Sequence, residues 1–380
     1  MVYLDNAATT YPKSESVYKA LDDANRNMAF NAGRGSYAKA RAATEIIDDT
    51  KRQIKNLVNA SVDSSVVFSP SITVALNQIL QGITWQRGDN IYYSPYEHNA
   101  VARTLQLIKK KVDINLFEMP VDEKSLKIDL EKLKYDFSIN SPRCVCCTHI
   151  SNVTGYVLPV AEIFECAKRY GAITILDTAQ SLGVEKIDMS KTNISFLAFA
   201  GHKSLYGPLG IGGFVDSGKV KLSEIMAGGT GSNSLVLDMP SESPDRYEFA
   251  SNNIVAIAGL NQALKEVDYT NLAEEDRLVR RLVDGLSEIE DVILYLPDSD
   301  LHRNIVSFNL KSYKSEDLGI ILDDDFGIAV RTGYHCAPFI HKWLKDDKNL
   351  GTVRVGIGKF NTEDDIDALL EAIREISEEG

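Results

Sequence analysis

The chain has 380 residues, of which 44% are hydrophobic and 25% are charged. This is the balance of an ordinary globular protein, and the length suffices for a main domain with a smaller one beside it. The formal net charge of -13 argues against non-specific nucleic-acid binding, because that function needs a basic face to neutralise phosphates. We therefore expect no nucleic-acid partner.

The sequence shows no targeting or membrane segment. Its start, residues 1–6, lacks a basic stretch followed by an apolar one, and its longest apolar runs are too short to span a bilayer. The five cysteines are odd in number and have no disulfide-scaffold spacing, which fits a reducing compartment. We expect a cytoplasmic protein without membrane contact.

Apolar strand-like runs alternate with helical patterns through the first two thirds of the chain. Strands are expected at residues 66–68, 90–93, 144–149, 173–176 and 196–199. This alternation is typical of an α/β protein in which a mostly parallel sheet carries helices on both faces. Ligands of such proteins bind at the carboxyl ends of the strands.

The pattern changes near residue 252. Helical periodicity over 254–267 and 273–288 is followed by an alternating segment at 304–309 and by a charged helix at the end of the chain. This order predicts a smaller α+β domain. We expect a large domain of residues 15–251, and a small domain formed by residues 1–14 and 252–380.

Two polar segments that follow predicted strands can contact a ligand. Ser69-Pro70-Ser71-Ile72-Thr73 opens a helix, where free backbone N–H groups and hydroxyls suit a phosphate, although a serine there can also be a simple helix cap. The second segment contains Glu97-His98-Asn99. A lone histidine such as His98 is more often structural than functional, so neither segment identifies a function by itself.

Two further segments carry an aspartate and a lysine. Asp177 ends an apolar strand, where a carboxylate is costly without a cationic partner. Lys203 follows another strand and precedes a glycine-rich stretch, as a nucleophilic amine would. A cofactor with a pyridine nitrogen and an aldehyde needs both groups. A structural ion pair between Asp177 and Lys203 explains the same residues, and the pattern alone leaves both interpretations open.

The ordered set of motifs resembles the class V aminotransferase family, specifically its cysteine desulfurase branch. The resemblance covers nearly the whole chain. Its motifs are residues 3–10, residues 149–155, the Asp-x-Ala-Gln and Gly-His-Lys segments, residues 331–337 and residues 351–354. It implies a fold type I pyridoxal-phosphate transferase, with a mostly parallel seven-stranded sheet in the large domain and a smaller α+β C-terminal domain.

The resemblance implies pyridoxal 5'-phosphate as the cofactor. Lys203 would hold it as a Schiff base, Asp177 would pair with its ring nitrogen, His98 would stack on the ring and Gln180 would bind its phenolic oxygen. The remaining cofactor contacts would come from Asn152, Ala179, Ser71, Thr73, His202 and Ser251. Of these, Thr73 and His202 would contact the phosphate, and Ser251 would reach it across the interface of a homodimer.

The same resemblance implies the reaction. L-cysteine would become L-alanine, with its carboxylate bound by Arg354, Arg331 and Asn152, and Lys203 would act as the base. Cys336 would accept the sulfur as a persulfide and pass it on, often to a scaffold protein in the similar group II branch. Cys336 lies in a polar loop, where Arg331 and His335 are expected to stabilise a thiolate.

A metal site is not expected, because neighbouring strand residues such as Cys146 and Cys147 point to opposite faces. The sequence also departs from the family pattern. Ala200 stands where the family commonly has Ser or Thr, and Ser71-Ile72 and Ala250-Ser251 each replace Gly-Thr. We expect weaker cofactor retention. The alternatives are a selenocysteine lyase, an aminotransferase or epimerase that does not need Cys336, and a scaffold protein without turnover.

Overall fold

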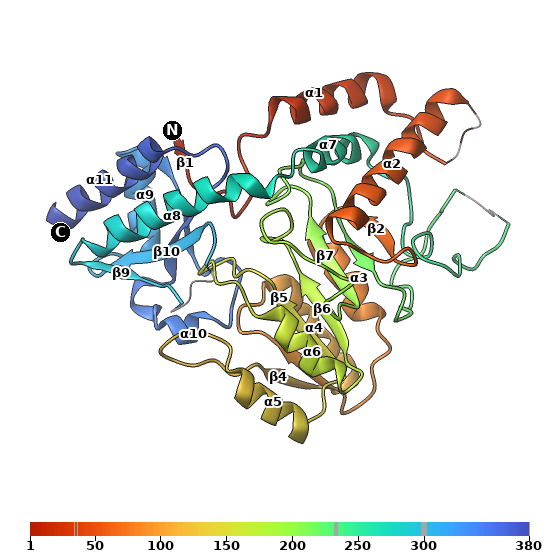
Figure 1. Cartoon of the computed structure of the whole chain (residues 1–380), viewed down its shortest axis with the longest axis horizontal. Coiled ribbons are helices and arrows are strands. Elements are labelled where there is room, and N and C mark those ends of the chain that lie inside the picture. The colour runs from red at the N-terminus through yellow and green to blue at the C-terminus, as the bar shows by residue number, and fades with distance from the viewer. Residues whose placement is uncertain (34, 36, 232–234, 298–301, 380) are drawn as a thin grey trace.

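The computed structural model describes residues 1–33, 35, 37–231, 235–297 and 302–379. The chain forms two layered units that lie next to each other, and both of its ends belong to the smaller unit (Figure 1). Of the helices in the described part of the chain, none combines the length and the apolar character that a membrane crossing requires.

The larger unit is built on a seven-stranded sheet with the order β2-β8-β7-β6-β5-β3-β4. Neighbouring strands are parallel except around β8, which runs antiparallel to β2 and β7. This confirms the mostly parallel sheet expected from the sequence. The strands are β2 (Ser65–Ser69), β3 (Asn90–Tyr93), β4 (Asn115–Glu118), β5 (Cys144–Thr148), β6 (Ile173–Asp177), β7 (Phe196–Ala200) and β8 (Gly212–Asp216).

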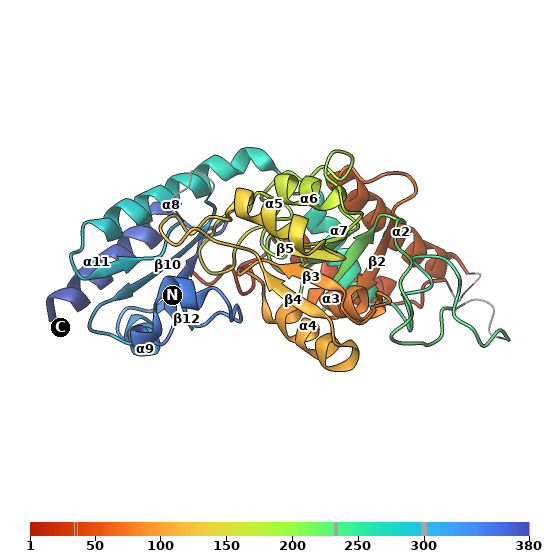
Figure 2. The ribbon, with the colours of Figure 1, turned by 90° about the horizontal axis from the view of Figure 1, so that it is seen from below.

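Helices cover both faces of this sheet, so β5, β6, β7 and β8 are buried along their whole length. Cys144 and Cys146 face the core under α3 and α4, whereas Val145 and Cys147 face the opposite core. Figure 2 shows α3 and α4 on one side of the sheet and α5 and α6 on the other. These helices are α3 (Ile72–Gly82), α4 (Asn99–Val112), α5 (Leu130–Ile139) and α6 (Val160–Lys168).

Helix α7 (Ile254–Leu264) packs against α1 (Glu15–Asp23) and α2 (Ala38–Leu57). Its Ile257 and Leu260 are part of the core of the larger unit. The sequence pattern placed residues 252–264 in the small domain, but an apolar helix joins whichever core it packs against. We propose that the boundary lies between α7 and α8 (Leu272–Ser287).

The smaller unit contains a four-stranded antiparallel sheet with the order β12-β13-β10-β9, packed against helices. Its strands are β9 (Val292–Leu294), β10 (Ile305–Leu310), β12 (Arg331–Gly333) and β13 (Thr352–Gly356), and its further helices are α9 (Ser315–Asp324), α10 (His341–Leu344) and α11 (Glu363–Glu379). The start of the chain joins this unit, because β1 (Val2–Tyr3) pairs with β11 (Ile328–Ala329). Three short helices complete the described chain: η1 (Ala24–Met28), η2 (Tyr269–Asn271) and η3 (Asp347–Asn349).

Candidate active site

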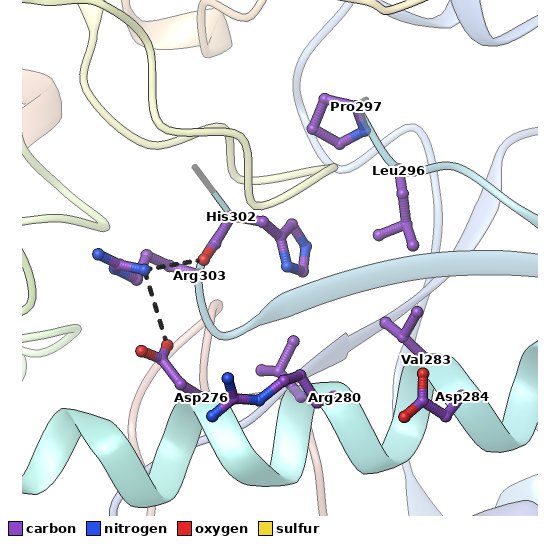
Figure 3. A pocket seen from close by; sticks show the side chains of 9 residues that line it. Asp276, Arg280, Val283, Asp284, Leu296, Pro297, His302 and Arg303 are labelled. Carbon is purple, nitrogen blue, oxygen red and sulfur yellow. Dashed lines mark hydrogen bonds and ion pairs between the residues drawn. The ribbon is translucent and has the colours of Figure 1, made fainter. Parts of the chain in front are cut away.

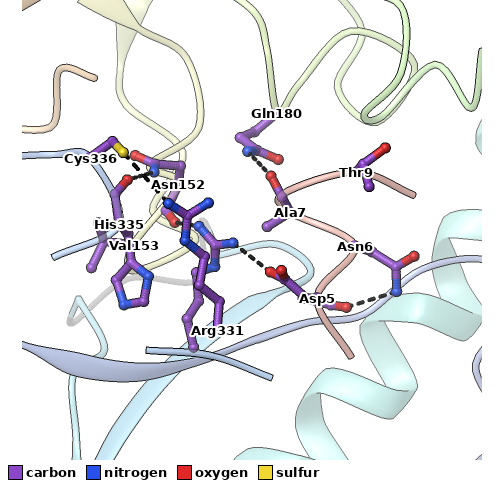
Figure 4. Close-up of polar contacts among 12 residues, drawn as sticks. Asp5, Asn6, Ala7, Thr9, Asn152, Val153, Gln180, Arg331, His335 and Cys336 are labelled. Atoms are coloured by element: carbon purple, nitrogen blue, oxygen red, sulfur yellow. Dashed lines mark hydrogen bonds and ion pairs between the residues drawn. The ribbon is translucent and has the colours of Figure 1, made fainter. Parts of the chain in front are cut away.

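The polar segments predicted from the sequence meet where the carboxyl ends of β3, β5, β6 and β7 face the smaller unit. Parallel strands end at the same edge of a sheet, which brings together residues far apart in the chain. Hydrogen bonds from Asn152 to His335, from Arg354 to Asn152 and from Gln180 to Ala7 join the two units here. Figure 4 shows the loops of both units and the N-terminal segment converging on this place.

Asp177 and Lys203 lie at neighbouring strand ends. The Oδ1 atom of Asp177 accepts a 2.8 Å hydrogen bond from the backbone N–H of Ala179. Burial raises the pKa of Asp177, and it lowers the pKa of Lys203 to about 8 against the opposing effect of the Asp177 charge. Among the described residues, no ion pair joins the two side chains. The structural ion pair is therefore not formed, and the two charges influence each other without contact.

His98 is fixed by its role as the N-cap of α4. Its Nδ1 accepts a 3.0 Å hydrogen bond from the backbone N–H of Ala100, so the ring proton lies on Nε2. Burial, followed by the nearby charge of Lys203, lowers the pKa of His98 to about 4. The imidazole is uncharged at neutral pH and has a fixed orientation, as a ring that stacks on a flat cofactor requires.

The N-terminus of α3 offers donors to an anion. Ser71 caps the helix through Oγ, which accepts from the N–H of Val74 at 3.3 Å. Within the described chain, the N–H groups of Ile72 and Thr73 donate to no protein group, as is normal for a helix start and suits a phosphate. Ala200 at the end of β7 is 2% exposed and offers only a methyl group.

His202 and Ser251 are the remaining predicted phosphate contacts. His202 lies beside Thr9, with 3.1 Å between Nδ1 and the threonine Oγ1, and burial lowers its pKa to about 4. Ser251 lines a cavity of about 300 Å³ together with Ser69 and Pro70 of its own chain. Its contact with the phosphate of a second subunit stays a prediction.

Cys336 lies on a loop whose backbone is held from three sides. His335 and Cys336 both have left-handed backbone angles, with φ of 46° and 58°. The carbonyl oxygens of residues 334, 335 and 336 accept hydrogen bonds from His341 Nε2 (3.0 Å), Asn152 Nδ2 (2.7 Å) and the N–H of Asn99 (2.7 Å), respectively. The last of these places Cys336 at the start of α4, next to His98.

One of the two groups expected to stabilise a thiolate is in place. The Nη2 of Arg331 lies 3.5 Å from Sγ of Cys336 (Figure 4). His335 was predicted to help, but this is wrong. Its ring is 3% exposed, Nε2 lies 2.9 Å from Thr352 Oγ1, and burial holds the pKa of His335 well below its usual value. The histidine is therefore neutral and engaged away from the sulfur.

Arg354 is partly occupied by its own chain. Its side chain is 1% exposed, with Nη2 2.7 Å from Asp5 Oδ1 and Nη1 donating to the carbonyl of Asn152 at 3.0 Å. Nε has no partner among the described residues. Burial lowers the pKa of Arg354, and the charge of Asp5 opposes this. Two of the five N–H groups of Arg354 are therefore engaged by its own chain, and Nε is a further donor that the described residues leave unpaired.

The two amides predicted to bind cofactor or substrate are also engaged with the protein. Asn152 holds the carbonyl of His335, and Gln180 donates through Nε2 to the carbonyl of Ala7 at 2.8 Å. Sequence reasoning missed Asp5 and Asn99 as contributors. Their only signal was membership of the motifs at residues 3–10 and 97–99, which gave no role to either.

The 370 Å³ cavity in the smaller unit contains none of the predicted site residues (Figure 3). It lies between α8 and the segment that leads into β10, and its polar walls include Asp276, Arg280, His302 and Arg303. Arg303 pairs with Asp276 at 3.8 Å and with Glu185. Arg303 is therefore paired within the protein, and none of the residues predicted for the active site lines this cavity.

The fold and this site define an α/β protein of the fold type I architecture. The sequence pattern of the family "Aminotransferase class-V" matches residues 2–369, and the chain belongs to this family. It is 33% identical to a probable cysteine desulfurase of Halalkalibacterium halodurans, over 100% of this chain and 93% of that protein. It is also 30% identical to a cysteine desulfurase of Wigglesworthia glossinidia brevipalpis, over 99% of this chain and 92% of that protein.

Solved structures show the same likeness. The apo structure of a cysteine desulfurase from Thermococcus onnurineus superposes with a TM-score of 0.89 at 28% identity, and the match covers 100% of this chain and 95% of that one. A cysteine desulfurase from Escherichia coli gives a TM-score of 0.84 at 25% identity and covers 100% and 94% of the two chains.

Proposed function

We propose that this chain is a pyridoxal-phosphate-dependent cysteine desulfurase that converts L-cysteine to L-alanine and takes the sulfur onto Cys336. The observation that carries the proposal is the position of Cys336, which is held at the start of α4 beside His98 and contacts Arg331 through its sulfur. An amine-transferring enzyme has no use for a thiol at this place. The names of the relatives agree with this chemistry.

The residues present fit the cofactor. Lys203 would hold its aldehyde, Asp177 its ring nitrogen, His98 its ring face, and the start of α3 its phosphate. In the described chain no ion pair joins Asp177 and Lys203, so neither side chain is held by the other. When bound, pyridoxal phosphate serves as an electron sink for the pair left at the substrate Cα.

The protein's own groups would carry out the remaining steps. With a pKa of about 8, Lys203 is partly unprotonated at neutral pH and can take the Cα proton. Arg331 and Arg354 orient the substrate carboxylate. The thiolate of Cys336 then attacks the substrate sulfur. A sulfur–sulfur bond forms, the Cβ–S bond breaks, and the carbon skeleton keeps its electron pair and takes up protons to become alanine.

The test separates cofactor binding from sulfur transfer. Wild-type protein supplied with pyridoxal phosphate should show the visible absorbance of the bound cofactor, and Lys203→Ala should lose it. Cys336→Ser should keep the spectral response to added cysteine but form neither alanine nor sulfide. Full activity of Cys336→Ser would contradict the proposal and favour the family members that do not need this thiol.

Two finer points belong to the same proposal. We infer a homodimer, in which Ser251 of one subunit approaches the phosphate of the other, and a sulfur-accepting scaffold protein as the next carrier. Sedimentation tests for the homodimer, and faster turnover in the presence of a candidate acceptor tests for the scaffold protein. Alanine formation from cysteine compared with selenocysteine distinguishes a desulfurase from a selenocysteine lyase.

A further inference from the structure

One of the three groups that hold the Cys336 loop is a titratable side chain. His341, the first residue of α10, donates through Nε2 to the carbonyl of Tyr334 at 3.0 Å. Its Nδ1 lies 2.5 Å from Oδ2 of Asp346, and the two side chains are 6% and 0% exposed. The ring of Tyr334 also packs edge-on against the imidazole, with 4.9 Å between the centroids. The contact is therefore buried and specific.

The hydrogen bonds of this pair fix its proton count. A carbonyl oxygen only accepts, so Nε2 of His341 carries a proton. The bond between Nδ1 and the Asp346 carboxylate needs a second proton, on either partner. Nε2 of His341 is thus one of two donors to the carbonyl of Tyr334, and the other is the backbone N–H of Ala337 at 2.9 Å.

The neighbouring titratable groups, His335 and Tyr295, are uncharged at neutral pH. The ring of His335 lies 6.3 Å from that of His341 and is neutral, because burial lowers its pKa and the charges of Arg354 and Arg331 add to the effect. Burial also raises the pKa of Tyr295, which senses the charge of Asp346. Among the described residues, no further ion pair reaches His341 or Asp346.

We propose that His341, held by Asp346, is a positioning residue for Cys336 and sets the direction in which its thiol points during sulfur transfer. Left-handed backbone at two consecutive non-glycine residues is strained and persists only when surrounding contacts over-determine it. The His341 contact lies one residue before this strained stretch. The inference rests on the proposed function, because Cys336 is the sulfur acceptor there.

Two substitutions at position 341 form a matched pair. The amide of His341→Gln reaches the position of Nε2 and can still donate to the carbonyl of Tyr334. The amide of His341→Asn is one bond shorter and occupies the place of Nδ1, so the carbonyl of Tyr334 keeps only the backbone N–H of Ala337 as a donor. His341→Phe is a second donor-free variant, which keeps the packing against Tyr334. Leu369→Ala removes a fully buried core side chain of the same unit, in α11, as a control for general destabilisation.

Three measurements on each variant test the role. They are the rate of persulfide formation on Cys336 by mass spectrometry, the exchange of the cysteine Cα proton with solvent in the holoenzyme, and hydrogen–deuterium exchange of the peptide around residues 331–337. We expect His341→Asn and His341→Phe to slow persulfide formation at least about tenfold, with Cα exchange unchanged and faster amide exchange in the loop. His341→Gln should recover most of the transfer rate, and Leu369→Ala should leave the ratio of the two rates unchanged.

Two outcomes would overturn the proposal: wild-type transfer rates in both donor-free variants, or equal losses of transfer and Cα exchange. If the proposed function itself is wrong, the measurements would give a different result. Cys336→Ser would then retain full activity, whereas amide exchange in the loop, which needs no turnover, would still respond to His341→Asn.

Discussion

The carboxyl group of Glu97 accepts a 2.6 Å hydrogen bond from the backbone N–H of Thr148, the residue that pairs with Asp177 across β5 and β6. The loop that carries His98 is thus tied to the strand next to Asp177. Glu97 is fully buried, and its Oε1 also accepts from Ser94 Oγ at 2.6 Å, whereas Oε2 has no partner among the described residues. Burial raises the pKa of Glu97 to about 8, so this acid is neutral at pH 7.

Glu97→Gln should remove a pH dependence of stability. A folded-state pKa raised from 4.5 to about 8 means that folding takes up a proton between these values, so wild-type stability falls as pH rises through that window. The slope approaches about 1.4 kcal/mol per pH unit. Glutamine can accept the same two hydrogen bonds and does not ionise.

Urea denaturation of the cofactor-free protein between about pH 5 and pH 9 measures this effect. The stability of Glu97→Gln relative to the wild type should rise with pH until about pH 8 and then level off. A difference that stays constant over the whole range would mean that Glu97 ionises normally in the folded protein.

Much of the site could be predicted, because its signals are local. Asp177 ends an apolar strand and Lys203 follows one, and the carboxyl ends of parallel strands share one edge whatever the details of packing. The strand expected at 173–176 is β6 (Ile173–Asp177), and the one expected at 196–199 is β7 (Phe196–Ala200). The alternation of strands and helices therefore suffices to predict that these two side chains lie at the same edge of the sheet.

The contacts that orient the side chains of the site could not be predicted from the sequence. Asp5 meets Arg354 across 349 positions of the chain, and His341 meets Tyr334 through a left-handed loop without a distinctive pattern. The place of α7 was missed for a related reason. Its residues are mostly buried, so no polar face shows which core it joins.

Ala200→Ser should tighten cofactor binding. Ala200 ends β7 opposite Gly212, and a Cβ on Gly212 would approach the N–H of Ile72 at the start of α3. A hydroxyl at position 200 would therefore lie near the expected phosphate. A hydrogen bond to a charged group contributes roughly 1.5–3 kcal/mol, which corresponds to about tenfold or more in the dissociation constant of pyridoxal phosphate.

Ala198→Ser is the matched control, because Ala198 lies two residues earlier on the same face of β7 and away from the strand end. Fluorescence titration of the cofactor-free protein gives both dissociation constants. Unchanged affinity in Ala200→Ser would show that phosphate retention does not depend on this position.

Asp5→Asn should lower the folding stability and raise the affinity for the substrate. Asp5 is the carboxylate that pairs with the buried guanidinium of Arg354, and its own side chain is 22% exposed. Removing its charge leaves Arg354 less compensated, which should cost about 2 kcal/mol of folding stability. Without the Asp5 charge, Arg354 attracts the substrate carboxylate more strongly, so the KM for cysteine should fall severalfold.

Asp367→Asn removes one partner of an exposed ion pair with Arg281 and serves as the comparison. Such surface pairs contribute at most about 1 kcal/mol, so this variant should keep wild-type KM and nearly wild-type stability. Denaturation curves and initial rates distinguish the two variants. A higher KM in Asp5→Asn would show that Asp5 chiefly orients Arg354.

Gly155→Ala should disturb the turn that presents Asn152. Gly155 has φ of 70°, and an added Cβ would collide with the backbone carbonyls of Ile305 and Arg303. Asn152 lies in the same turn and contacts both His335 and Arg354. We expect a stability loss of more than about 2 kcal/mol, because backbone atoms cannot move aside as a side chain can, together with slower sulfur transfer to Cys336.

Gly171→Ala separates backbone strain from this collision. Gly171 has a similar φ of 65°, but no atom lies within 4 Å of an added Cβ. Its replacement should cost only the strain of the left-handed conformation, about 1 kcal/mol, and should leave sulfur transfer unchanged. Equal denaturation midpoints for the two variants would mean that the turn yields to the new methyl group. The close approach of Gly155 to β10 would then not be what holds Asn152 in place.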